Sequence, residues 1–170
     1  MFEALTLGVF EAGLSWSVVF GKRDDLRRAF HNFDIAKVAA MTERDVDRLV
    51  QDASIIRNRG KIQATVDNAR AMRSASPSLG ALAKSYESTR THAPRALADL
   101  PTATPHAEAF AKQLKSQGYR FVGPTSVYAF MQNVGAPGHG AGPAGCVRAL
   151  HCEQGTAVGC ILEPGRLIVP

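Results

Sequence analysis

The sequence predicts an all-α fold. Apolar residues recur at spacings of three and four along most of the chain, and helix-capping residues stand before and after several of these stretches. Only residues 167–169, at the very end, show the alternation that is typical of a strand. We therefore expect short helices joined by short loops.

Length and composition indicate one globular domain with an anionic partner. The 170 residues are enough for a buried core, and 45% of them are hydrophobic. The net charge of +5 favours a partner such as nucleic acid. No apolar run reaches the roughly 20 residues that span a bilayer, so we expect no membrane contact. Three cysteines in the last quarter form no disulfide framework, which favours a cytoplasmic location.

The first element is predicted as one buried helix over residues 2–20, which are apolar almost throughout. Two glycines interrupt it, Gly8 and Gly13, and each costs a helix interior about 1 kcal/mol relative to alanine. Such a cost is tolerated where a backbone approaches something closely or where a helix ends. Trp16, the one tryptophan, is either a core residue or a stacking platform for a base. The helix opens without a cap, so we expect that an upstream segment is missing.

The next elements are short capped helices. Residues 21–33 predict an amphipathic helix whose charges are either solvated or part of a basic DNA-facing patch. Asp34 is the expected N-cap of residues 35–41. Thr42 and Asp45 match a capping box for the helix that follows.

A cluster of cations comes next, with Arg57, Arg59 and Lys61 around Gly60 at the start of another helix. These residues either grip phosphates or are ordinary surface charge. Serine, proline and glycine then predict loops on both sides of one further helix: loops at residues 74–79 and 90–105, and the helix at residues 80–88.

The last two helices are predicted to form a hairpin. The first covers residues 107–117, with Thr104 as N-cap, Pro105 at the first helical position and Gly118 as the stop. After a tight turn at Gly123 and Pro124, the second runs to about residue 133. Its free N–H groups and the small glycine suit a phosphate oxygen, which would hold nucleic acid by its backbone. The alternative is an ordinary packing corner between two helices.

Three segments carry a family resemblance. FEALTLGVFEAGLSWSVVFGKRDDLRRAFHNFD, IIRNRGKIQATVDNAR and GYRFVGPTSVYAFMQNVG follow one another over residues 2–135. In this order they closely resemble the 3-methyladenine DNA glycosylase I family of the helix-hairpin-helix superfamily. The resemblance implies a helical glycosylase domain over residues 1–135 and leaves residues 136–170 as a divergent tail.

The resemblance also implies an activity. Members of this family flip an alkylated adenine out of double-stranded DNA and hydrolyse its N-glycosidic bond in base excision repair. Trp16 matches the base-stacking tryptophan, and Phe10, Gly8 and Tyr128 are assigned to the same base pocket. Three further groups are assigned to DNA binding. Gly13 and Leu14 match residues that fill the gap left by the flipped base, Gly123, Thr125 and Ser126 match the phosphate-binding turn, and Arg57, Arg59 and Lys61 are assigned to the phosphates.

One departure from the family pattern concerns the chemistry. Gly8 occupies the position at which the family has a purine-selecting glutamate, while Glu11 stands one turn later on the same helical face. Either Glu11 takes over hydrogen bonding to the adenine, or the pocket has lost its activity. Thr125 occupies the place of the lysine that gives bifunctional relatives strand cleavage, so we expect a monofunctional enzyme.

The other departure concerns metal. The family resemblance implies a structural zinc held by residues of both termini, and the matching N-terminal ligands are absent here. His139 and Cys146 lie six residues apart, and His151 with Cys152 offers only adjacent donors. We therefore expect no zinc, no other cofactor, and a monomer that binds DNA. A DNA-binding or damage-sensing module without turnover is the alternative function.

Overall fold

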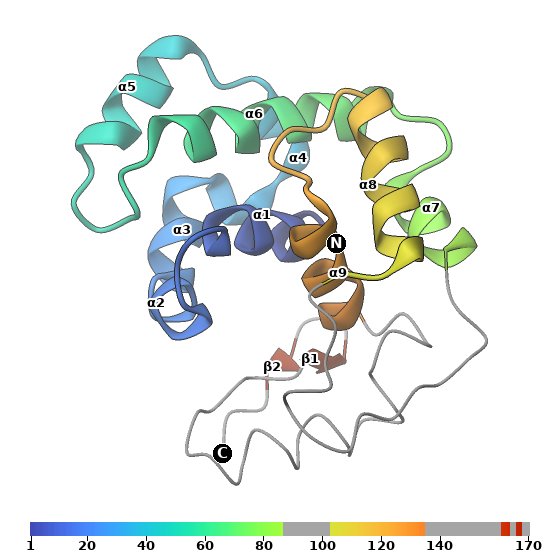
Figure 1. The fold of residues 1–170 in the computed structure, drawn as a ribbon. Helices are drawn as coiled ribbons and strands as arrows, with labels where there is room; N and C mark the ends of the chain where they lie inside the picture. The colour runs from blue at the N-terminus through green and yellow to red at the C-terminus, as the bar shows by residue number, and fades with distance from the viewer. Residues whose placement is uncertain (87–102, 135–160, 164–165, 168–170) are drawn as a thin grey trace, which may run out of the picture.

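The computed structural model describes residues 1–86, 103–134, 161–163 and 166–167, and its elements are helical apart from two short strands. The elements are α1 (Phe2–Glu11), α2 (Trp16–Gly21), α3 (Arg23–Ala29), the 3₁₀-helix η1 (His31–Phe33), α4 (Ile35–Ala39), α5 (Glu43–Gln51), α6 (Arg59–Ser74), α7 (Leu79–Ser85), α8 (Pro105–Ser116), α9 (Pro124–Asn133), β1 (Ile161–Glu163) and β2 (Arg166–Leu167). The two strands pair with each other, antiparallel. The all-α prediction is confirmed (Figure 1).

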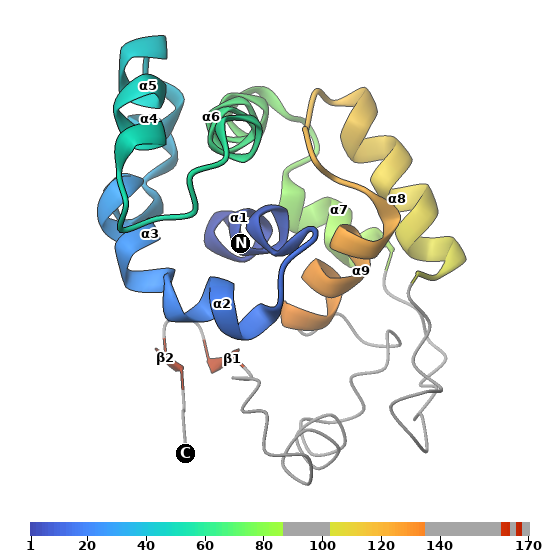
Figure 2. The ribbon, with the colours of Figure 1, turned by 60° about the vertical axis from the view of Figure 1, so that its left-hand side comes forward.

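Helix α1 lies at the centre of the fold, with α2 to α6 on one side and α7 to α9 on the other (Figure 2). Eight of its ten residues are buried. Ala4 and Leu5 pack in one apolar cluster with α7, α8 and α9, whereas Phe2, Leu7 and Phe10 pack in a second cluster with α2 to α6. A helix that is apolar all round is expected in an interior. The two halves of the core therefore meet at α1.

The prediction of one helix over residues 2–20 is wrong. Helix α1 ends at Glu11, and a new helix begins at Trp16. Gly13 has a φ of +77°, the left-handed conformation that glycine adopts without strain, and the N–H of Leu14 bonds the carbonyl of Glu11 at 2.7 Å. The second glycine therefore marks a turn, and it exposes the loop between the two helices.

Most of the predicted caps are confirmed. The side chains of Asp34 and Thr104 accept hydrogen bonds from the first turns of α4 and α8, and Thr42 and Asp45 form the capping box of α5. Gly118 closes α8 with a φ of +88°. The Gly118 and Tyr119 N–H groups bond the carbonyls of Lys115 and Leu114, the pattern of a Schellman motif.

One predicted helix is divided in two. The amphipathic stretch of residues 21–33 forms α3 and then η1, because His31, Asn32 and Phe33 all have φ values between +52° and +57°. Three consecutive left-handed residues cannot continue a right-handed helix. The chain turns there and leads into α4.

An ion-pair cluster ties α1 to α3. Glu3 accepts hydrogen bonds from Arg23 Nε at 2.7 Å and from Arg27 Nε and Nη2 at 2.9 and 3.0 Å. Burial alone raises the pKa of Glu3, but the bonds from Arg27 and Arg23 outweigh burial, so the pKa lies below its ordinary value of 4.5. The paired carboxylate therefore stabilises the fold above that pH.

We predict that Glu3→Gln lowers the free energy of unfolding by about 1 kcal/mol at pH 7, because two guanidinium groups lose their partner. The gap to wild type should narrow as pH falls from the ordinary pKa of 4.5 and close below the lower pKa of the folded protein, where the wild-type carboxylate is itself protonated. Thermal melts of both proteins at pH 7 and at about pH 3 measure this. A gap of the same size at both pH values would contradict the role of charge.

Candidate nucleic-acid interface

Three segments far apart in the sequence meet beside α1. They are the α1–α2 loop (residues 12–15), the stretch of α6 from Lys61 to Asn68, and the α8–α9 hairpin (residues 117–123), which passes α6 on its way into α9 (Figure 1). Lys61 Nζ of α6 donates to the carbonyl of Phe10 at 2.8 Å. Asn68 of α6 bonds the backbone of Arg120 in the hairpin. The interface is thus assembled on α6.

The start of α9 provides free backbone donors. The N–H of Val127 bonds the carbonyl of Gly123 at 2.9 Å, so Gly123 is the N-cap and Pro124 occupies the first helical position, as predicted. The N–H groups of Thr125 and Ser126 then have no partner within the helix. No acidic side chain lies in this first turn, and a helix N-terminus attracts anions. The turn can therefore hold a phosphate oxygen.

The α1–α2 loop presents an apolar side chain to solvent. Leu14 is 41% exposed at the tip of this loop, next to the exposed Gly13. An isolated exposed leucine needs no explanation by itself. Here it follows a glycine turn, and Lys61 of α6 bonds the carbonyl of Ala12 just before that turn. This position suits a residue that inserts into a duplex.

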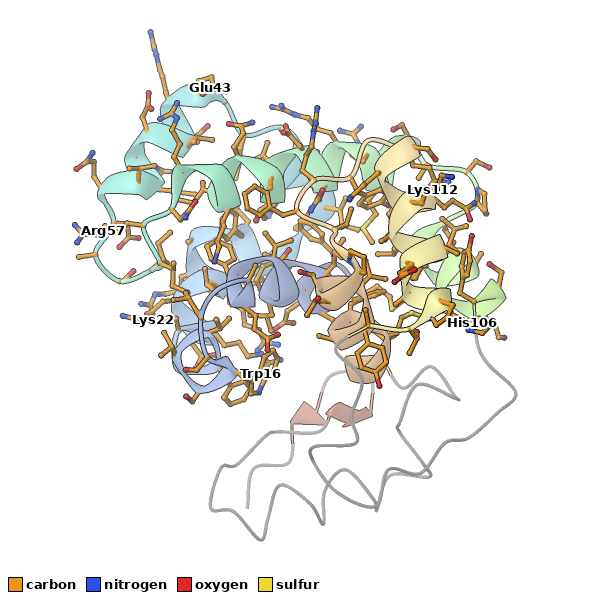
Figure 3. All side chains as sticks on the ribbon, in the orientation of Figure 1. Trp16, Lys22, Glu43, Arg57, His106 and Lys112 are labelled. Carbon is orange, nitrogen blue, oxygen red and sulfur yellow. The ribbon has the colours of Figure 1, made fainter. Side chains whose placement is uncertain are left out.

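Trp16 follows this loop at the start of α2, at the edge of the described fold (Figure 3). It is half-buried, with its ring stacked on Phe20 at a centroid distance of 5.9 Å. Its Nε1 atom is buried and has no hydrogen-bond partner among the described residues. The ring lies between core and surface, so both of its predicted roles, core residue and stacking platform, stay open.

Gly8 lies on the side of α1 that faces α9. A Cβ atom built on Gly8 would lie 3.6 Å from the carbonyl oxygen of Ser126, an ordinary van der Waals distance. The missing side chain would therefore point toward the first turn of α9. Because the Cβ atom fits, the position tolerates the beginning of a side chain.

Glu11, one turn later, is half-buried at the end of α1. Burial raises its pKa above the ordinary value. Within the part of the chain that the structure describes, its side chain has neither a hydrogen bond nor an ion pair. An unpaired, partly desolvated carboxylate attracts a cation.

Two residues assigned to the base pocket lie deeper than expected. Phe10 is 0% exposed, with its ring 6.1 Å from that of Phe30. The assignment of Phe10 to the base is therefore corrected, because its position on the inner face of α1 places it in the core. Tyr128 is also buried, on α9 in the same cluster as Leu5, so its contact with a base stays a prediction.

The three predicted phosphate-binding cations differ in placement. Lys61 is buried and bonds the carbonyls of Phe10 and Ala12, so its assignment as a surface contact to phosphate is wrong. Arg59 is exposed but pairs with Glu43 and Asp47 of α5. Arg57 points away from the fold in the loop before α6 (Figure 3). It has no ion pair with any described residue.

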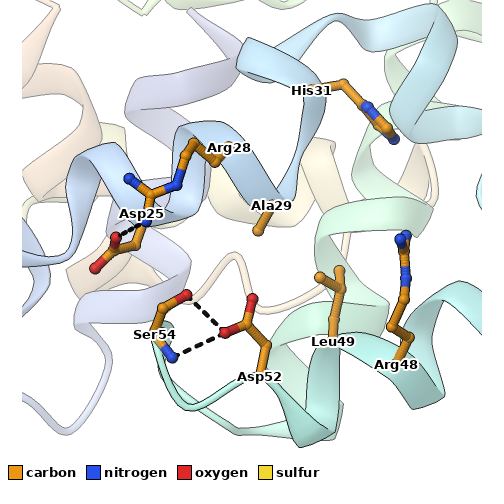
Figure 4. Close-up of a pocket in the computed structure, with 8 residues that line it drawn as sticks. All are labelled: Asp25, Arg28, Ala29, His31, Arg48, Leu49, Asp52 and Ser54. Carbon is orange, nitrogen blue, oxygen red and sulfur yellow. Dashed lines mark hydrogen bonds and ion pairs between the residues drawn. The ribbon is translucent and has the colours of Figure 1, made fainter.

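A cavity of about 230 Å³ lies elsewhere, between α3, η1 and α5 (Figure 4). Its charged groups bond their own neighbours: Arg28 pairs with Asp25, and Asp52 accepts from the N–H and hydroxyl of Ser54 at 2.8 and 2.6 Å. None of the predicted site residues lines it. No pattern in the sequence predicted this cavity.

The described residues hold no candidate metal site. No group of three or more histidine, cysteine or acidic side chains that could hold one occurs among residues 1–86, 103–134 and the two short strands. His139, Cys146, His151 and Cys152 lie outside the described residues, as do Gly135 and the predicted domain boundary beside it. The absence of zinc therefore stays a prediction.

Known proteins resemble this chain in sequence and fold. Residues 1–140 match the model of the methyladenine glycosylase family. DNA-3-methyladenine glycosylase 1 of Escherichia coli K12 is 46% identical over 140 residues, which are 79% of this chain and 75% of that protein. The crystal structure of a 3-methyladenine DNA glycosylase I is 44% identical, with a TM-score of 0.72 over 81% of this chain and 77% of that one. A variant enzyme in complex with 3-methyladenine is 31% identical, with a TM-score of 0.70 over 81% and 75%.

We predict that Arg57 contributes more to nucleic-acid binding than Arg59 does. Arg57→Ala should reduce the slope of log affinity against log salt by about 1, since one phosphate contact is lost. Arg59→Ala should change it less, because Arg59 already pairs with two carboxylates. Fluorescence anisotropy with an undamaged duplex at several salt concentrations gives both slopes. Equal slopes for the two variants would contradict the assignment.

Proposed function

The chain belongs to the methyladenine glycosylase family, and we propose that it excises 3-methyladenine from double-stranded DNA by hydrolysing the N-glycosidic bond. The observation that carries the proposal is the convergence of the α1–α2 loop and the α8–α9 hairpin on α6, beside Gly8 and Ser126. One segment can insert into a duplex while the other holds its backbone. Relatives that share this fold carry the name of the activity.

The reaction needs little acid catalysis. Alkylation at N3 makes the adenine cationic, so the base leaves readily when the bond from C1′ to N9 breaks and water oxygen bonds C1′. The base departs neutral, and the water proton passes to solvent. Flipping costs a few kcal/mol and least for a damaged base. The proposed enzyme therefore has mainly to position the base, with Trp16 offering its ring face to the cation.

DNA binding is divided between two segments in this proposal. Leu14, beside Gly13, fills the space of the flipped nucleotide. Gly123, Thr125 and Ser126 hold a phosphate on the far side of the base pocket, where the α9 dipole favours negative charge. Backbone contacts of this kind position the duplex without reading its sequence.

Glu11 is the carboxylate that we assign to the base in place of the one missing at Gly8. Its lack of a described partner leaves both oxygens free to accept from the adenine amino group. A cationic base beside it would also lower its raised pKa again, because opposite charge favours the ionised form. Neutral adenine cannot offer that interaction, which favours the damaged base.

Gly8 favours one alternative function, a DNA-binding or damage-sensing module without turnover. Such a module would keep the α8–α9 hairpin and its salt-dependent binding. It would differ from the enzyme only in failing to release a base.

We expect the protein to act as a monomer in the cytoplasm. Among the described helices, none is long and apolar enough to cross a membrane. The partner that we propose is DNA carrying alkylated bases.

We predict that Glu11→Gln lowers the single-turnover rate of 3-methyladenine release at least tenfold, because the amide cannot offset the charge of the base. The matched control is Glu108→Gln, which removes an exposed carboxylate in the first turn of α8. Chromatography of bases released from methylated duplex DNA measures both. Full activity of Glu11→Gln would exclude the role of Glu11, and restored activity in the double variant Gly8→Glu/Glu11→Gln would locate the carboxylate.

Stability provides the folding control. Because burial raises the pKa of Glu11, the stability given by its protonated form is lost as pH rises through the raised pKa. Glu11→Gln should therefore melt at a higher temperature than wild type at pH 7 and at the same temperature below about pH 4. A lower melting temperature of Glu11→Gln than of wild type at pH 7 would mean that the variant lost activity because its fold is destabilised.

We predict no strand cleavage after base release, because Thr125 cannot form a Schiff base with the sugar. Incubation of the protein with methylated DNA and sodium borohydride should trap no covalent protein–DNA complex. Denaturing gels should show intact strands until alkali is added. A trapped complex would contradict the monofunctional assignment.

A further inference from the structure

Helix α6 carries two buried polar side chains whose hydrogen bonds leave the helix. Lys61 is 6% exposed and Asn68 is 1% exposed. They lie seven residues apart, close to two helical turns, so they project from the same side of α6. Each bonds one of the two segments assigned above to DNA. Burying a polar group is costly unless it is hydrogen-bonded, so the packing of an apolar core does not by itself account for these two residues.

Lys61 closes the C-terminal end of α1. Its Nζ atom donates to the carbonyls of Phe10 at 2.8 Å and Ala12 at 2.5 Å. Helix α1 has no basic residue in its own last turn, so Lys61 supplies the positive charge that a helix C-terminus favours. The Ala12 carbonyl already belongs to the α1–α2 loop. The ammonium group therefore fixes the point from which Gly13 and Leu14 project.

Asn68 holds the α8–α9 hairpin by a pair of bonds to one residue. Its Nδ2 atom donates to the Arg120 carbonyl at 3.1 Å, and its Oδ1 atom accepts from the Arg120 N–H at 2.6 Å. The amide thus satisfies both backbone groups of Arg120. Beside it, Phe121 packs against the start of α6, where a Cβ on Gly60 would lie only 3.3 Å from the Phe121 ring.

We propose that α6 sets the spacing between the inserting loop and the phosphate-binding turn, with Lys61 and Asn68 as its positioning residues. The inference rests on the proposed function, because both segments must meet one duplex at once. Lys61 determines where Leu14 and Trp16 stand, and Asn68 determines where the first turn of α9 stands. Displacing one segment impairs its own step and leaves the other step intact, since misplacement of a positioned group is costly.

The test compares Lys61→Met and Asn68→Leu with a matched control, Thr65→Val. Thr65 is buried on the same helix, and its hydroxyl bonds only the carbonyl of Lys61 within α6. Lys61→Met should lower kcat for 3-methyladenine release at least tenfold, with affinity for an undamaged duplex within about twofold of wild type. Asn68→Leu should raise KM and the Kd for the undamaged duplex about tenfold, with little change in kcat. Thr65→Val should change neither.

The emission of Trp16, the one tryptophan in the chain, distinguishes release of the α1–α2 loop from a general loss of stability. Its emission should shift in folded Lys61→Met, because the loop before it is released, and should stay unchanged in Asn68→Leu. If either variant fails to fold, Lys61→Gln and Asn68→Asp make smaller changes at the same positions.

Two results would overturn the proposal. One is kcat and KM changing together to the same extent in both variants, and the other is activity of both equal to wild type. If the wild-type protein releases no base, the proposed function fails. The split between Trp16 emission and duplex affinity still decides the role of α6, because neither measurement requires turnover.

Discussion

The burial of α1 between the two halves of the core determines how the other helices are arranged. Its residues belong to both apolar clusters, so α2 to α6 and α7 to α9 are joined through one ten-residue helix. A helix enclosed in this way cannot leave its terminal carbonyls to water, and buried carbonyls without partners are costly. Lys61 meets that need from α6, and Gly13 turns the chain out of the core.

The same constraint places the functional segments. The last turn of α1 lies beside the first turn of α9, and Gly8 faces the carbonyl of Ser126 there. The chain then emerges as a short exposed loop next to Trp16. In the proposed function the base is held between a core helix and a helix N-terminus, which together combine low exposure with backbone donors. These properties suit the recognition of a cationic alkylated base within polyanionic DNA.

The sequence predicted the fold class and most helix ends, because caps such as Asp34, Thr104 and Gly118 act within one turn of the chain. The break after Glu11 could not be read from apolar periodicity, since Phe2, Leu5 and Trp16 keep a helical spacing across it. The prediction that Lys61 contacts phosphate at the surface was wrong for a related reason. Lys61 looks like its neighbours Arg57 and Arg59 in sequence, and only the packing of α6 against α1 separates them. Asn68 gave no local signal because its partner is 52 residues away.

We propose that this chain catalyses base excision with a carboxylate that α1 supplies one turn beyond Gly8. The first measurement is the amount of free 3-methyladenine that the folded wild-type protein releases from methylated duplex DNA. We expect stoichiometric release of the alkylated base in a single turnover, with intact strands. Tight, salt-sensitive binding of the same DNA with no released base would exclude catalysis and leave a binding module on the glycosylase fold.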